Sequence, residues 1–175
     1  IDRLYNLRGN PDREAVYARL ERRSAQLRDR LERVGKAQMG LTYGEHPRAC
    51  LDVFESSRAP TGVLIFFHGG YWRALDRLLF SCLAEVCLDL GVAVVTPGYP
   101  LAPECSLPDI VAHARRALDW TTTQSPVAGL PWVVSGHSAG GHLAEMCVLG
   151  AAHGSALRGS IPISGLFDLR PLRHT

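Results

Sequence analysis

Residues 136–142 read Gly-His-Ser-Ala-Gly-Gly-His, between the apolar run 131–135 and a segment, 143–149, that is typical of a helix. A serine between small residues at a turn from strand to helix is the context of a nucleophile elbow, whose strained backbone holds the hydroxyl clear of the chain. Glycine is needed at 136 and 140 because a β-carbon there would collide with the neighbouring strand or helix. The pattern therefore predicts that Ser138 is a nucleophile.

A second motif, His-Gly-Gly-Tyr-Trp at 68–72, directly follows the apolar run 63–67. Two consecutive glycines after a strand can turn their N–H groups into a cleft. Such donors stabilise the oxyanion that forms when a serine attacks a carbonyl, and each lowers the barrier by roughly 3–4 kcal/mol. The usual further donor is the residue after the nucleophile, here Ala139, at a helix N-terminus whose dipole favours an anion. The alternative is that Gly69 and Gly70 form only a tight turn.

Strand and helix patterns alternate along the rest of the chain. The segments 40–43 and 49–54 predict an antiparallel hairpin around the turn 44–47, and in the second segment Leu51 and Val53 alternate with Asp52. The later predicted strands are 63–67, 92–95, 132–135 and 159–164, and the predicted helices are 75–90, 107–122 and 139–149. Pro162 indicates the end of the last strand or an irregularity in it. This order predicts an α/β fold with a mainly parallel sheet.

The first part of the chain predicts a single long helix over residues 10–36, begun by Asn10-Pro11-Asp12. Its apolar residues lie three, four or seven apart and form one narrow stripe, made of Val16, Leu20, Leu27, Leu31 and Val34. A helix of this kind packs along one edge of a domain and is otherwise solvated. A lid and a dimer contact are the alternatives.

The amino-acid composition limits the kinds of molecule that we expect the protein to bind. The 175 residues carry a net charge of +2 and are 46% hydrophobic, which suits one globular domain and gives no reason to expect nucleic acid or a membrane as partner. No apolar run approaches the roughly 20 residues of a membrane span. The five cysteines show no metal-ligand spacing, so we expect buried free thiols, a cytoplasmic location, and neither metal nor cofactor. Because the sequence starts with Ile1, an upstream signal stays open.

The two motifs, in this order and about 70 residues apart, resemble the α/β-hydrolase superfamily. The resemblance is greatest to arylformamidases (kynurenine formamidases) and to the carboxylesterases related to hormone-sensitive lipase. Tyr71-Trp72 after the two glycines is the formamidase-like form, where the esterases more often have a third glycine. The resemblance spans about residues 40–170 and includes the segments 98–103 and 164–169.

The resemblance implies a role for each motif residue. Ser138 would be the nucleophile, the backbone of Gly69, Gly70 and Ala139 would form the oxyanion hole, and Tyr71 and Trp72 would line the substrate pocket. For the last two residues, simple core or rim packing is the alternative. The implied substrate is a small ester or formamide: N-formylkynurenine in a formamidase, or a short acyl ester in a carboxylesterase. A non-catalytic binding protein with a relic elbow is the rival class, and a homodimer is compatible with all three.

In the resembled superfamily the triad acid and the histidine follow the nucleophile, on strands beyond the sixth. Because the chain stops at Thr175, we expect both residues to lie beyond it, and the 175-residue piece alone to be an incomplete catalyst. The predicted division is a helical segment, 1–38, and the first two-thirds of an α/β-hydrolase domain, 39–175. Asp168 is a weaker candidate for the acid. The histidines within the chain are poor candidates for the base, namely His137, His142 and His174.

Overall fold

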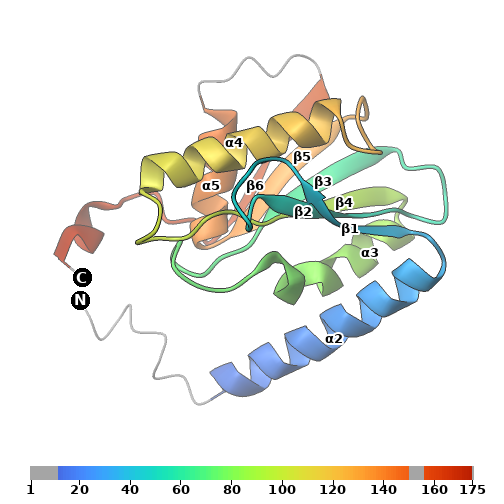
Figure 1. Ribbon diagram of the computed structural model, residues 1–175, viewed down its shortest axis with the longest axis horizontal. Coiled ribbons are helices and arrows are strands. Elements are labelled where there is room, and N and C mark those ends of the chain that lie inside the picture. Colours follow the sequence, from blue (N-terminus) through green and yellow to red (C-terminus); the bar gives the residue numbers. More distant parts are fainter. Residues whose placement is uncertain (1–11, 150–155, 175) are drawn as a thin grey trace.

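The computed structural model describes residues 12–149 and 156–174, with side chains up to residue 172. Within these residues a six-stranded mixed sheet has the order β1-β2-β4-β3-β5-β6, with helices on both faces (Figure 1). The strands are β1 (Ala37–Thr42), β2 (Cys50–Phe54), β3 (Gly62–Phe67), β4 (Val92–Pro97), β5 (Trp132–His137) and β6 (Leu157–Ile163). The predicted α/β fold is confirmed.

The sheet has an antiparallel part and a parallel part. β1 pairs antiparallel with β2, and β2 antiparallel with β4, so the predicted hairpin is confirmed. β3 pairs in parallel with both β4 and β5, and β5 in parallel with β6. The run Val63–Phe67 lacks alternation because β3 lies in the middle of the sheet and is covered on both faces.

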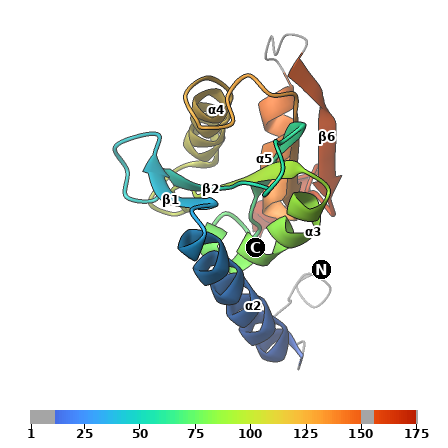
Figure 2. The same cartoon turned by 90° about the vertical axis from the view of Figure 1, so that its right-hand side faces the viewer.

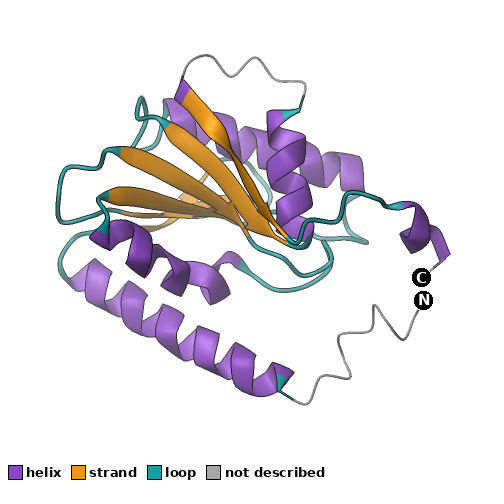
Figure 3. Ribbon diagram, turned by 180° about the vertical axis from the view of Figure 1, so that it is seen from behind, coloured by secondary structure: helices purple, strands orange, loops and turns teal. Residues whose placement is uncertain are grey.

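Helices cover the sheet in two layers, which the end-on and rear views separate clearly (Figures 2 and 3). α4 (Leu107–Thr123) and α5 (Ala139–Val148) lie on one face. α2 (Arg13–Arg33) and α3 (Ala84–Asp89) lie on the other. Each layer has its own core: the larger lies under α4 and α5, and the smaller joins Leu27 of α2 to Leu88 of α3.

The helix α4 agrees with its predicted bounds to within one residue at its C-terminal end. Ser106 is its N-cap, because the Ser106 hydroxyl accepts the backbone N–H of Asp109 at 3.3 Å. Its apolar residues at helical spacing are buried, namely Ile110, Val111, Ala114 and Leu118. A local cap and a regular apolar stripe were therefore enough to define this element.

The predicted helix 75–90 is wrong in form. The chain instead makes a 3-10 helix, η2 (Arg77–Leu83), which continues into the short α3. The physical reason lies in α2, whose side chains take the backbone groups that an α-helix would use internally. Ser24 donates to the carbonyl of Leu79 at 2.8 Å and accepts the N–H of Cys82 at 3.0 Å. Arg28 donates to the carbonyl of Leu78.

The apolar residues of 75–90 have helical spacing, but only some of them face the core. Leu83, Val86 and Leu90 are 42%, 67% and 73% exposed, whereas Leu88 is buried. The 3-10 geometry has about three residues per turn instead of 3.6, so the face that meets the core is not the one a regular helix would present.

The helix α2 begins at Arg13, and the predicted start at Asn10-Pro11 lies outside the described residues. Of its predicted stripe only Leu27 is buried, while Val16 and Val34 are 37% and 64% exposed. The buried Ser24 makes the contact with η2, whereas Leu27 packs in the smaller core with Leu88 of α3. α2 therefore packs on the outside of the layer that contains α3.

Asp52 of β2 departs from the expectation of an alternating strand, since its side chain is fully buried. Its carboxylate accepts the backbone N–H of Gly40 at 2.8 Å and lies 3.0 Å from the guanidinium of Arg77. Burial raises the pKa of Asp52, and the charge of Arg77 opposes that rise. The ion pair links β2 to η2.

β6 is an edge strand of the described sheet, and it contains Pro162 directly opposite Gly136 of β5. β6 ends at Ile163, one residue after the proline, which agrees with the predicted end of the strand. An edge strand tolerates proline because one side makes no ladder bonds. The register shift lies earlier, opposite Trp132 and Val133. Ile161 and Ile163 of this edge are 55% and 46% exposed.

None of the five cysteines, all of which are described, forms a disulfide. Cys82 and Cys147 are buried, as expected, whereas the other three are half-buried, namely Cys50, Cys87 and Cys105. No helix in the described ranges combines the length and the hydropathy that crossing a bilayer requires.

The Ser24 contact gives a stability prediction. Ser24→Ala leaves the Leu79 carbonyl and the Cys82 N–H without their partner, so the free energy of unfolding should fall by about 2 kcal/mol. Urea denaturation measures this, and hydrogen exchange at the Cys82 amide should accelerate. Ser57→Ala, at an exposed position between β2 and β3, is the control and should change little. Equal stability of the two variants would contradict the role of Ser24.

Candidate active site

Ser138 occupies the turn between β5 and α5 in a conformation that few side chains adopt. Its backbone angles are φ 55° and ψ −117°, in the positive-φ region that disfavours residues with a β-carbon. Its N–H donates to the carbonyl of Ile163 at 2.8 Å, so β6 supports the turn. Strain of this kind persists only where surrounding contacts impose it, and it is common at functional sites.

Close backbone packing explains the glycines on either side of Ser138. A β-carbon at Gly136 would lie 2.2 Å from the carbonyl oxygen of Gly140, and one at Gly140 would lie 2.0 Å from that of Phe67. Neither distance is compatible with a side chain. The prediction that these positions need glycine because of the neighbouring strand and helix is confirmed.

The loop 68–72 lies directly against this turn. A β-carbon on Gly69 would be 2.8 Å from the carbonyl oxygen of His137 and 3.4 Å from Cβ of Ser138. Gly70 has φ +116° and accepts the N–H groups of Arg73 and Ala74, each at 3.0 Å, which closes a tight turn. The two motifs, distant in sequence, are thus brought together at the carboxyl ends of β3 and β5.

Three N–H groups near Ser138 are free to bind a ligand atom. Within residues 12–149 and 156–174, no hydrogen bond uses the backbone N–H of Gly69, Gly70 or Ala139. Ala139 is the first residue of α5, where N–H groups have no partner inside the helix and the helix dipole favours negative charge.

His68, which precedes Gly69, forms the buried support of this loop. Its ring stacks on Tyr99 with centroids 4.2 Å apart, and its Nδ1 lies 2.7 Å from the carbonyl oxygen of Gly69. The Tyr99 hydroxyl donates to the His68 carbonyl at 2.7 Å. Burial lowers the pKa of His68 to about 4, so the ring is neutral at pH 7. The sequence analysis assigned no role to His68, although its place before two glycines was the available signal.

The histidines considered as the base are not bonded to Ser138. His142 is 7% exposed, and its ring packs edge-to-face on that of Trp72 with the ring centroids 5.2 Å apart. Burial lowers the pKa of His142. His137 is exposed, and the side chain of His174 lies outside the described part. Within the described residues no imidazole hydrogen-bonds the Ser138 hydroxyl.

Asp168, the weaker candidate for the acid, lies in the exposed segment after β6. Both carboxylate oxygens bind the guanidinium of Arg170 at 2.8 Å, and one also accepts the Arg170 backbone N–H at 3.1 Å. These hydrogen bonds lower the pKa of Asp168. In this arrangement the Asp168 carboxylate is therefore in an ion pair with Arg170.

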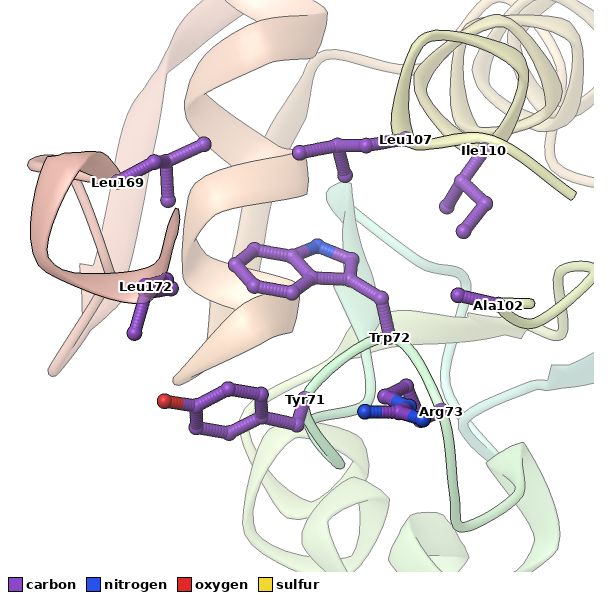
Figure 4. A pocket seen from close by; sticks show the side chains of 8 residues that line it. All are labelled: Tyr71, Trp72, Arg73, Ala102, Leu107, Ile110, Leu169 and Leu172. Carbon is purple, nitrogen blue, oxygen red and sulfur yellow. The ribbon is translucent and has the colours of Figure 1, made fainter. Parts of the chain in front are cut away.

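Tyr71 and Trp72 line a cavity of about 270 Å³, which we call the Trp72 pocket (Figure 4). Trp72 is central, with Leu169 and Leu172 on one side of its indole ring. The full lining is Tyr71, Trp72, Arg73, Ala102, Leu107, Ile110, Leu169 and Leu172. The last six were not predicted, because five of them come from segments separate from the motif and Arg73 lies just beyond its end. Among the described residues no group of three or more histidine, cysteine or acidic side chains is arranged to hold a metal.

A mixed sheet whose central strands are parallel, a strained serine turn and an adjoining double-glycine loop define an α/β-hydrolase. The family model described as alpha/beta hydrolase fold matches residues 64–175, and the chain belongs to this family.

Relatives within the family are formamidases and esterases by name. The chain is 34% identical to the kynurenine formamidase of Danio rerio over 84% of its own length and 52% of that protein. It is 36% identical to carboxylesterase 20 of Arabidopsis thaliana over 47% of its length and 28% of that protein. The chain spans about half the length of the curated formamidases it matches.

Solved structures agree on the fold. A protein from Silicibacter sp. TM1040, proposed to be a thioesterase, superposes with a TM-score of 0.88 at 36% identity, over 98% of this chain and 65% of that one. Esterase B of Lactobacillus rhamnosis superposes with a TM-score of 0.58 at 26% identity, over 79% of this chain and 49% of that one.

His68 predicts an acid-dependent loss of stability. The ring titrates near 6.5 when unfolded but near 4 when folded, so the unfolded state binds more protons between these values. The free energy of unfolding should therefore fall by about 3 kcal/mol as the pH drops from 6.5 to 4. In His68→Phe, which keeps a stacking ring but cannot be protonated, this dependence should be shallower by that amount.

Urea titrations of both proteins across this pH range measure the difference. The other buried histidines are present in both proteins, so their contributions cancel. Parallel pH dependences in the two proteins would show that His68 is not the group responsible.

Proposed function

We propose that the protein is a serine hydrolase that cleaves an ester or formamide through an acyl-enzyme on Ser138. The observation that carries the proposal is the strained Ser138 turn beside three free backbone N–H groups. The Ser138 oxygen forms a bond to the substrate carbonyl carbon while its proton passes to a base. The amine or alcohol then leaves with a proton, and water releases the acid from the serine.

Gly69, Gly70 and Ala139 would hold the negative charge that forms on the carbonyl oxygen. Donors fixed in place before the reaction need no reorganisation when the charge develops, and each contributes about 3–4 kcal/mol of barrier lowering. The loop support from His68 and Tyr99 suits this role, because it fixes the peptide that carries the donors.

The mechanism also needs a base and an acid that orients it. We place both outside the residues that the structure describes, because no described imidazole bonds the Ser138 hydroxyl. Asp168 stays the weaker candidate for the acid, and would have to leave Arg170 to act.

For the substrate we propose a formamide, with N-formylkynurenine giving kynurenine and formate. The support is the activity named for the formamidase relatives, which match 84% of the chain, together with the Tyr71-Trp72 pair after the glycines. A short-chain carboxylesterase is the second candidate, and it is favoured by the similarity to carboxylesterase 20 and to esterase B.

Covalent labelling tests the nucleophile. The whole protein should react with a fluorophosphonate probe at Ser138, and Ser138→Ala should not react, because only an activated serine attacks the probe. The same substitution should lower turnover on the order of 10⁶-fold. Ser135→Ala, three residues earlier on β5, is a matched control that should keep its label. A folded, unlabelled wild-type protein would instead favour the third alternative, a non-catalytic binding protein.

Specificity constants separate the two candidate substrates. For each substrate, kcat/KM is divided by the rate constant of its spontaneous hydrolysis. We expect this ratio to be larger for N-formylkynurenine than for 4-nitrophenyl acetate. Steady-state assays of the whole protein measure both. A preference for the ester by several orders of magnitude would retire the formamidase proposal and leave the serine hydrolase intact.

A further inference from the structure

Arg73 gives the Trp72 pocket an unbalanced charge. Among the described residues that line it, Arg73 is the only charged one, and the others are aliphatic or aromatic. Its side chain is exposed and forms no hydrogen bond or ion pair with any described residue. Figure 4 shows Arg73 on the same side of the indole as Tyr71, with Leu107 and Ile110 on the other side.

Two acidic groups close in sequence to the pocket residues are paired with other arginines. Asp76, three residues after Arg73, lies 3.2 Å from the guanidinium of Arg48 and 3.7 Å from that of Arg77. Asp168, adjacent to Leu169, binds Arg170 at 2.8 Å. Arg73 engages neither carboxylate. It is also not paired with Asp109, which is next to Ile110 and accepts the Ser106 hydroxyl at 2.6 Å, so the guanidinium of Arg73 has no carboxylate partner among the described residues.

The pocket is also close to the nucleophile. Its central residue, Trp72, rests on His142, which is one turn of α5 or about 6 Å along the axis from Ser138. Its first residue, Tyr71, lies two positions after Gly69, which contacts the Ser138 turn. Contacts through Trp72 and through the loop at Gly69 thus join the pocket to the turn that carries Ser138.

The size of the pocket suits one substituted ring. Its volume is about 270 Å³, whereas an apolar cavity of about 150 Å³ is enough to hold benzene. A ring placed among the leucines would have its substituents directed toward the open, charged side.

We propose that the Trp72 pocket selects substrates whose aromatic or apolar part bears a carboxylate, and that Arg73 is the specificity residue that binds this group. The proposal rests on the hydrolase function above and names its substrate class. The guanidinium of Arg73 presents two parallel N–H donors that match the two oxygens of a ligand carboxylate. A ligand amide of the same shape has no negative charge and only one oxygen. Selection then comes from charge and the fork geometry together.

Binding of two isosteric ligands tests this without requiring turnover. By calorimetry, the whole protein should bind phenylacetate about tenfold more tightly than phenylacetamide, which differs only in replacing the carboxylate with a neutral amide. In Arg73→Met the two affinities should become equal, and Arg73→Lys should keep part of the preference. Added salt should weaken the preference in the wild type because the guanidinium is exposed.

Arg58→Met is the matched control. Arg58 is exposed in the loop before β3, at the opposite end of that strand from the pocket, so the same loss of charge there should leave the preference unchanged. Equal binding of the two ligands by the wild type, binding of neither, or a preference that survives in Arg73→Met would each overturn the proposal.

The outcomes also separate this proposal from the proposed function. Ester hydrolysis without a carboxylate preference would remove the role of Arg73 and keep the hydrolase. A carboxylate preference that depends on Arg73, in a protein that neither hydrolyses esters nor labels at Ser138, would keep the ligand class and remove the hydrolase.

Discussion

The contact between the start of α5 and the end of β3 is the constraint on which the rest of this structure depends. Gly140 approaches the carbonyl oxygen of Phe67 so closely that a side chain at this position has no room. This approach places a helix N-terminus over the central strand of the sheet. It also brings the loop that follows β3 against the turn that carries Ser138, so one backbone contact assembles both halves of the site.

Aromatic side chains packed around this contact make it rigid. His68 and Tyr99 lie stacked beneath the double-glycine loop, and Tyr99 comes from the segment after β4, the strand beside β3. Trp72 joins the same loop to α5 through His142. Two aromatic contacts thus hold the loop, His68 with Tyr99 and Trp72 with His142. They give a fixed orientation to a peptide that has no regular secondary structure.

The sequence predicted those parts of the molecule that local patterns determine. The central strands, α4, α5 and the glycines of the Ser138 turn could be inferred because their signals lie within a few residues. η2 could not be inferred, since Ser24 and Arg28 of α2 bind its carbonyls from fifty or more positions away. The burial of Asp52 depends in the same way on Arg77. The Trp72 pocket combines four separate segments, so its leucines looked like ordinary core residues.

The hydrogen bond from the Ser138 amide to the carbonyl of Ile163 has a consequence for how far the motif can act alone. The seven residues 136–142 carry the whole recognisable pattern, yet the acceptor that fixes the serine backbone comes from a strand that begins fifteen residues after them. A shortened chain that ended before β6 would keep the motif in its sequence and lose the geometry that gives it meaning. For this family, the seven-residue motif alone therefore does not contain all the contacts that position the serine.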